Sequence, residues 1–94
     1  MYTIITTRQF EKELVLCKKR GYDISEFRKV AQLLEKTGTL PEKYKPHKLS
    51  GNYKNCWECH IKPDWLLIWQ KNDTELILLF MNTGTHSDLY WHSL

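Results

Sequence analysis

The spacing of apolar residues predicts two helices in the first part of the chain. Phe10, Leu14 and Cys17 recur every three or four residues, which predicts a helix over residues 8–19. A second stripe at the same spacing predicts another helix over residues 25–36. This second stripe consists of Ile24, Phe27, Val30, Leu33 and Leu34.

The flanking residues favour boundaries at the ends of both helices. Thr7 is expected to cap the first helix, and Asp23 or Ser25 the second. Short polar side chains accept hydrogen bonds from the free N–H groups of a first turn. Gly21 and Gly38 follow the apolar stripes and are expected to end the helices. The two helices then form a hairpin that needs an apolar surface to cover.

The remaining apolar segments have the composition of β-strands. Residues 2–6 are β-branched and aromatic, and three further strands are predicted at residues 53–61, 65–71 and 75–81. Residues 39–51 are expected to form a loop, because prolines and a glycine interrupt them.

The connections between the last three strands are short enough for hairpins. Turns are expected at residues 63–64 and 72–73, so the neighbouring strands should run antiparallel. A third turn is expected at residues 83–85, followed by a last helical turn or short strand at residues 87–91. The predicted fold is a single α+β domain, residues 1–94, of order β-α-α-β-β-β. In it, a twisted antiparallel sheet has both helices on one face and the other face at least partly open.

The composition excludes several classes of protein. Hydrophobic residues make up 41% and charged residues 27% of the 94 positions, an ordinary globular mixture. No apolar run approaches the ~20 residues that span a bilayer, and the N-terminus lacks the basic start of a signal peptide. Three cysteines do not suggest a secreted disulfide framework. We therefore expect a cytoplasmic protein without a membrane segment.

The net charge of +3 is mild, but the placement of the lysines suggests a partner. A protein that binds single-stranded RNA needs positive side chains that contact the phosphates and aromatic rings that stack on the bases. A solvated lysine-rich loop would have the same composition. The lysines of this segment are Lys43, Lys45, Lys48, Lys54 and Lys62, and the aromatic residues are Tyr44, Tyr53 and Trp57.

All four histidines lie at or beyond the midpoint of the chain: His47, His60, His86 and His92. Histidine exchanges protons near neutral pH, so these residues are candidates for acid–base chemistry. Asp64 follows His60 at a predicted hairpin. The last three strands form a meander, so the strand that precedes His86 should lie beside the strand that follows Asp64. RNA cleavage needs a base for the 2′-hydroxyl proton, a cation at the phosphorane and an acid for the leaving 5′-oxygen.

Side chains alternate along the strand that contains His60. One face carries Cys56, Glu58 and His60, and the other carries Trp57, Cys59 and Ile61. The apolar set should pack against the helices, so Glu58 and His60 should point to the open face. A structural interpretation also exists: a lone histidine can be merely exposed, and Asp64 can be only a turn residue.

Residues 56–60 match the C-x-x-C-H pattern of covalent haem attachment. The segment is predicted to be a strand, on which Cys56 and Cys59 face opposite sides. No second C-x-x-C is present to complete a zinc site. Neither haem nor zinc is therefore expected, and one thiol should be buried and the other exposed.

Three motifs resemble the YafQ branch of the RelE toxin superfamily. They are K-P-H-K-L-S-G at residues 45–51, W-E-C-H-I-K-P-D-W-L-L-I-W at residues 57–69, and T-G-T-H-S-D-L-Y at residues 83–90. The resemblance covers essentially the whole chain. It implies a RelE-like microbial ribonuclease fold and the toxin of a type II toxin–antitoxin pair. Such toxins cut messenger RNA in the ribosomal A site without a metal or cofactor, leaving a 2′,3′-cyclic or 3′-phosphate and a 5′-hydroxyl. A DinJ/RelB-like antitoxin, encoded beside the toxin, is the expected partner.

The resemblance also assigns roles by motif position. The acid–base set is His47, His60, Asp64 and His86. Trp65 and Tyr90 match positions that place RNA or complete the site, and Glu58 matches a position that is usually acidic. His86 is preferred for proton transfer near the scissile phosphate, with the other two histidines assisting.

One position departs from the family. In the family, an arginine usually stands four residues before the histidine that matches His86. This chain has Asn82 at that position. Asparagine carries no charge, and losing such a stabiliser can raise the barrier by ~2–4 kcal/mol. Lys48, Lys54 or Lys62 would then have to supply positive charge. Two alternatives therefore stay open: a weakly active or inactive member kept for antitoxin binding and autoregulation, or a binding toxin that inhibits gyrase.

Overall fold

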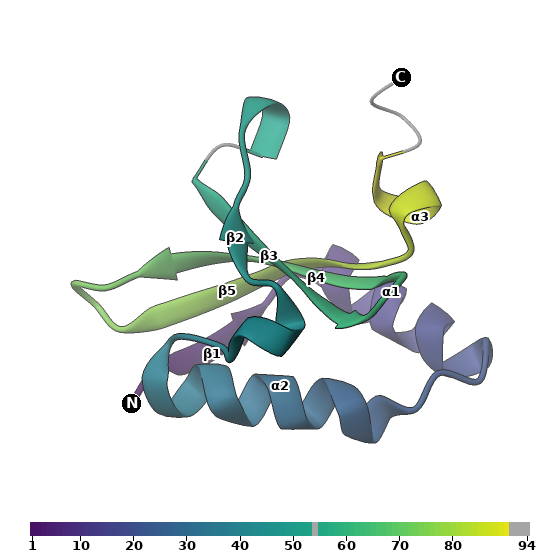
Figure 1. The fold of residues 1–94 in the computed structure, drawn as a ribbon, viewed down its shortest axis with the longest axis horizontal. Coiled ribbons are helices and arrows are strands. Elements are labelled where there is room, and N and C mark those ends of the chain that lie inside the picture. The colour runs from purple at the N-terminus through teal and green to yellow at the C-terminus, as the bar shows by residue number, and fades with distance from the viewer. Residues whose placement is uncertain (54, 91–94) are drawn as a thin grey trace.

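The computed structural model describes residues 1–53 and 55–90, which form a five-stranded sheet with two long helices on one face (Figure 1). The strand order is β1-β5-β4-β3-β2. The strands are β1 (Thr3–Thr6), β2 (His47–Lys48), β3 (Cys56–Lys62), β4 (Trp65–Asn72) and β5 (Ile77–Gly84). The predicted α+β class and the placement of both helices on one face are confirmed.

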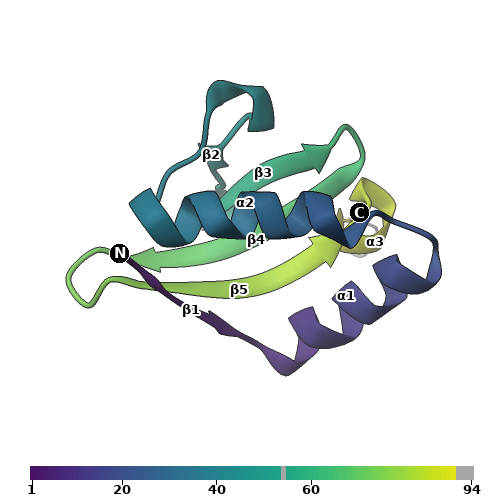
Figure 2. The ribbon, with the colours of Figure 1, turned by 90° about the horizontal axis from the view of Figure 1, so that it is seen from below.

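The helices α1 (Arg8–Lys19) and α2 (Ile24–Thr37) lie below the sheet, and Figure 2 shows α2 crossing the middle strands. Thr7 and Asp23 cap them as predicted, accepting hydrogen bonds from Phe10 N–H and Ser25 N–H. Within the described residues, no helix has the length and apolar character that crossing a membrane requires.

Short elements occupy segments that were expected to be irregular. The predicted loop over residues 39–51 contains the 3-10 helix η1 (Glu42–Tyr44) and strand β2, and η2 (Gly51–Tyr53) begins at its end. The predicted last helical turn is α3 (His86–Tyr90), and Trp91 lies outside the described residues.

The sheet is mixed, so the prediction of a wholly antiparallel sheet is wrong. β3, β4 and β5 form the expected antiparallel meander, but β1 runs parallel to β5, with Thr3 opposite Ile77. A parallel neighbour needs a crossover, and α1 and α2 form part of that connection. The turn predicted at residues 83–85 is also wrong, because β5 continues to Gly84.

The main core lies between the sheet and the two helices. Phe10 joins the layers, with its ring centroid 5.5 Å from that of Phe80 on β5 and 5.7 Å from that of Phe27 on α2. The strands β3 and β4 contribute a row of buried side chains to the same core: Cys59, Ile61, Trp65, Leu67 and Trp69. This packing fixes the sheet on which the site is built.

A smaller apolar cluster covers part of the opposite face. It contains Cys56, Leu66, Ile68 and Leu89, the last of these supplied by α3. Cys56 and Cys59 are therefore both buried, and the prediction of one exposed thiol is wrong. The two thiols belong to separate clusters on opposite faces, so they cannot bind one metal ion together.

Candidate active site

Three histidines approach one another on the face of the sheet opposite α1 and α2. His47 comes from β2, His60 from β3 and His86 from the start of α3. The ring centroid of His60 lies 6.4 Å from that of His47 and 5.6 Å from that of His86. We call these three residues the histidine cluster. His92 lies outside the described residues. Imidazoles at this spacing can act together on a single phosphate.

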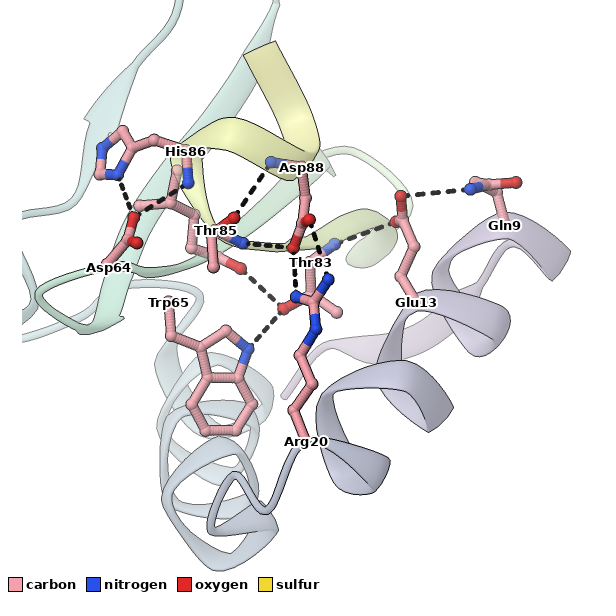
Figure 3. Close-up of polar contacts among 10 residues, drawn as sticks. Gln9, Glu13, Arg20, Asp64, Trp65, Thr83, Thr85, His86 and Asp88 are labelled. Carbon is pink, nitrogen blue, oxygen red and sulfur yellow. Dashed lines mark hydrogen bonds and ion pairs between the residues drawn. The ribbon is translucent and has the colours of Figure 1, made fainter. Parts of the chain in front are cut away.

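Asp64 fixes His86 through two contacts (Figure 3). Its Oδ1 accepts a hydrogen bond from the His86 backbone N–H at 3.0 Å and lies 2.6 Å from His86 Nδ1. The carboxylate accepts, so Nδ1 carries a proton in this contact and Nε2 remains available. These hydrogen bonds, the backbone one foremost, lower the pKa of Asp64. Asp64 is therefore ionised at neutral pH and holds the exposed ring in one orientation.

His60 is oriented by the backbone of its own hairpin. Its Nδ1 lies 3.2 Å from the carbonyl oxygen of Pro63. A carbonyl only accepts, so Nδ1–H donates and Nε2 is again left for a second partner. The strand pairing shifts register between His60 and Lys62, and such a bulge re-aims side chains.

Both ring nitrogens of His47 face acceptors. Nδ1 lies 2.8 Å from the carbonyl oxygen of Lys45, and Nε2 lies 3.1 Å from Glu58 Oε1. Both contacts are hydrogen bonds at once only when both nitrogens carry protons. Among the described residues, both nitrogens of His47 are therefore engaged, whereas His60 and His86 are each held through Nδ1 alone.

Glu58 links His47 to α3. Its side chain is 6% exposed, and its second oxygen accepts a hydrogen bond from the hydroxyl of Tyr90. A buried carboxylate is stable only when it is paired in this way. Burial, and then the hydrogen bond to Glu58, raise the pKa of Tyr90, so its hydroxyl remains a donor at neutral pH. Glu58 lies beneath the surface and positions other groups.

Arg20, at the end of α1, braces α3 (Figure 3). Its guanidinium donates two hydrogen bonds to the carboxylate of Asp88, at 2.6 and 3.1 Å. Thr85 and Asp88 also cap one another at the start of α3, each backbone N–H donating to the other's side chain. The hydrogen bond from Arg20 lowers the pKa of Asp88 to about 2. The ion pair between Arg20 and Asp88 is therefore charged at neutral pH. Together with the contacts between Thr85 and Asp88, it holds the backbone on both sides of His86.

Asn82 is engaged with α1 instead of facing a substrate freely. Its amide donates to the two oxygens of Glu13 at 3.1 and 3.3 Å, and the backbone N–H of Thr83 donates to Glu13 Oε1 at 3.1 Å. The position expected to contribute positive charge thus has a carboxylate beside it. Any cation at the phosphate has to come from elsewhere.

The sequence from residue 2 to residue 91 matches the family described as the bacterial toxin of type II toxin–antitoxin systems, YafQ. The chain belongs to the YafQ family. A curated relative is the mRNA interferase toxin YafQ of Escherichia coli strain K12, 37% identical over 83 residues. The match covers 87% of this chain and 88% of that protein.

Solved YafQ structures have the same fold. The crystal structure of YafQ from E. coli strain BL21(DE3) matches with a TM-score of 0.88 at 34% identity, covering 96% of this chain and 99% of that one. The crystal structure of the E. coli DinJ–YafQ toxin–antitoxin complex matches with a TM-score of 0.85 at 36% identity, covering 95% and 97%. The resemblance to the RelE/YafQ toxins is confirmed.

On the YafQ fold, six of the predicted site residues come together: His47, Glu58, His60, Asp64, His86 and Tyr90. Trp65 does not join them. It is 3% exposed, and its Nε1–H donates to Thr83 Oγ1 at 2.9 Å within the core. Trp65 therefore cannot stack on a base, and it supports the site from beneath.

The lysines expected to replace the family's arginine are not gathered at the histidine cluster. Lys48 lies opposite Trp57 in the β2–β3 pairing, with Nζ 5.8 Å from its ring centroid. Neighbours along a strand face opposite sides, so Lys48 points away from the side that His47 faces. Lys62 Nζ lies 4.0 Å from Glu26 on α2. Lys54 lies outside the described residues.

Proposed function

We propose that this toxin is an mRNA interferase that cuts messenger RNA in the ribosomal A site by acid–base chemistry, without a metal ion. The observation that carries the proposal is the meeting of three imidazoles and Asp64 on one exposed surface. Acid–base catalysis at neutral pH needs such groups within reach of the reacting atoms. The name of the E. coli relative, mRNA interferase toxin, supports the same reaction.

His86 and His60 are the proposed proton-transfer residues. Asp64 engages Nδ1 of His86, and the Pro63 carbonyl engages Nδ1 of His60. Each ring therefore has Nε2 available to take a proton from the 2′-hydroxyl or to give one to the 5′-oxygen. One ring serves as the base and the other as the acid.

The reaction balances between the RNA and these two histidines. The base takes the 2′-hydroxyl proton while the 2′-oxygen forms a bond to phosphorus. The bond from phosphorus to the 5′-oxygen breaks, and the acid protonates that oxygen. The products are a 2′,3′-cyclic phosphate, which water can open to a 3′-phosphate, and a 5′-hydroxyl.

His47 has a supporting role in this scheme. Its two nitrogens face the Lys45 carbonyl oxygen and Glu58, so it ties β2 to the buried carboxylate beneath the cluster. Asn82 carries no charge and donates to Glu13, so it supplies no cation for the phosphorane. Glu58 and Tyr90 position this ring from beneath.

We also propose that the toxin acts in the cytoplasm, where it meets ribosomes and messages, and that a cognate antitoxin inhibits it. DinJ forms a complex with YafQ in the E. coli structure. An antitoxin segment that orders on binding and covers the histidine cluster would block access of RNA.

Single-turnover cleavage of a ribosome-bound message tests the proposal. His86→Ala should lower the rate at least about a hundredfold with an unchanged melting temperature. Glu35→Ala, an exposed position on α2, serves as the matched control and should cleave like the wild type. Toxin that has been treated with EDTA and then freed of the chelator should cleave like untreated wild type. A wild-type protein that binds antitoxin but leaves the message intact would instead support the autoregulatory alternative.

A further inference from the structure

A groove of about 360 Å³ opens beside the histidine cluster, on the side of His60. Its walls come from the start of α2, the segment that leads into β2, and the β3–β4 hairpin. The charged and aromatic residues that line it are Glu26, Lys43, Tyr44, Lys45, His60 and Lys62. His60 is therefore a wall of the groove and the central member of the histidine cluster at the same time.

The groove has an excess of positive charge. Three lysines face one carboxylate, Glu26. That carboxylate is already compensated, because Lys29 lies 3.4 Å from its Oε1, and Lys62 lies 4.0 Å from its Oε2. Lys43 and Lys45 form no ion pair among the described residues. An anion that enters the groove therefore meets ammonium groups that are free to bind it.

The wall that carries Lys43 and Lys45 is held in place by the active site itself. The N–H of Lys45 donates to Glu42 O at 2.8 Å, and its carbonyl oxygen lies 2.8 Å from Nδ1 of His47. Lys43 Nζ lies 5.1 Å from the ring centroid of the buried Tyr44. These contacts tie the backbone of Lys45 to His47 and place the ammonium group of Lys43 beside the ring of Tyr44.

We propose that this groove is a binding subsite for a phosphodiester of the RNA strand that is being cut, next to the scissile phosphate. The proposal rests on the ribonuclease function proposed above and adds to it. Because His60 belongs to both the groove and the histidine cluster, an RNA strand with one phosphate at the cluster can place a neighbouring phosphate in the groove. Lys43, Lys45 and Lys62 position the strand, and the histidine cluster performs the chemistry.

Binding of a short RNA that cannot be cut separates this proposal from catalysis. A 2′-O-methyl oligonucleotide lacks the attacking hydroxyl, so its dissociation constant is measured on the intact protein without turnover. The test variant is Lys43→Gln, Lys45→Gln and Lys62→Gln combined. The matched control is Lys12→Gln, Lys19→Gln and Lys36→Gln combined, which removes the same charge from exposed helix positions.

The groove variant should bind at least ten times more weakly than the wild type, and the control variant less than threefold more weakly. Each lost phosphate contact lowers the slope of log affinity against log salt by about 0.7 for a single strand. The groove is proposed to bind one phosphodiester, so the slope of the groove variant should fall by about 0.7. Equal weakening by both triple variants, or no weakening by either, overturns the proposal.

Neutral methylphosphonate linkages identify which phosphate the groove binds. Replacing one linkage beside the scissile position should weaken binding by the wild type and have no further effect on the groove variant. A groove variant that loses activity only on ribosomes, with normal oligonucleotide binding, would assign the lysines to ribosomal RNA and overturn the proposal. Unmeasurable binding by the wild type overturns it too, whereas cleavage of ribosome-bound message would still uphold the proposed function.

Discussion

One oxygen of Asp64 contacts both the backbone nitrogen and the ring Nδ1 of His86. Main chain and side chain are thereby tied to a single carboxylate on the β3–β4 hairpin. The position of the ring depends on that hairpin as much as on α3.

Asp64→Ala should consequently impair cleavage without unfolding the protein. The ring of His86 would lose its orientation, and we expect the single-turnover rate to fall about a hundredfold. Asp64→Asn keeps an acceptor oxygen and should lose less. Because the pKa of Asp64 is lowered from its ordinary value of 3.8, the contact holds at neutral pH and weakens only as pH falls through the lowered value. Equal rates for Asp64→Ala and wild type between pH 6 and 8 would contradict the assignment.

Restoring the family's arginine tests the role of position 82. Asn82→Arg brings a guanidinium next to Glu13, which would pair with it and reduce its effect on RNA. We expect a modest gain in cleavage from Asn82→Arg alone. The double variant Asn82→Arg and Glu13→Gln should cleave about tenfold faster than wild type. This gain is smaller than the rate that enzymes usually lose when a group stabilising the transition state is removed. Glu13→Gln alone is the control, and no gain in the combined variant would count against a phosphate at this position.

Tyr90→Phe removes the hydroxyl that Glu58 accepts from. One oxygen of a buried carboxylate then loses its partner, which should cost about 1–2 kcal/mol in the free energy of unfolding at pH 7. The raised pKa of Tyr90 adds a pH dependence: its stabilising effect is complete below the ordinary value of 10.0 and is lost as pH rises further. Urea unfolding at pH 8 and 10.5 should therefore show a smaller alkaline loss in Tyr90→Phe than in wild type. Tyr53, whose pKa burial also raises, accounts for part of the remaining loss.

Trp65→Phe distinguishes support from base stacking. It removes the hydrogen bond to Thr83 Oγ1, which itself donates to the carbonyl oxygen of Leu66 at 2.7 Å. We expect the free energy of unfolding to fall by about 2 kcal/mol, with unchanged affinity for RNA. Thr83→Val breaks the same bond, so the two substitutions together should destabilise less than the sum of each alone. Weaker RNA binding at full stability would show that the ring contacts RNA.

Local patterns in the sequence predicted most elements of the fold. The boundaries of α1 were correct because its apolar spacing, Thr7 cap and glycine stop all agree. The parallel pairing of β1 with β5 was missed, since hairpin reasoning considers only strands that follow one another. The burial of Cys56 was missed for a similar reason: its cover, Leu89, comes from α3 far along the chain.

Of the candidate site, the sequence predicted the residues that are proposed to react, and it missed their supports. Alternation along β3 correctly put Glu58 and His60 on one face, and the motifs named His47, Asp64 and His86. The supports Glu13 and Arg20 were missed, because they lie 69 and 68 positions from the residues they contact and look like surface charges on α1. The orientation of Lys48 followed from its position beside His47, once β2 was known to be a strand.

The pairing of the first strand with the last also bears on how the protein is made. β1 is synthesised well before its partner β5, and Thr7 contacts Met81 across 74 positions. Contacts this distant form late in folding. His86 follows β5, so a partly translated chain has neither a closed sheet nor a complete histidine cluster. A protein proposed to halt translation therefore has no complete histidine cluster until both β5 and the start of α3 have been synthesised.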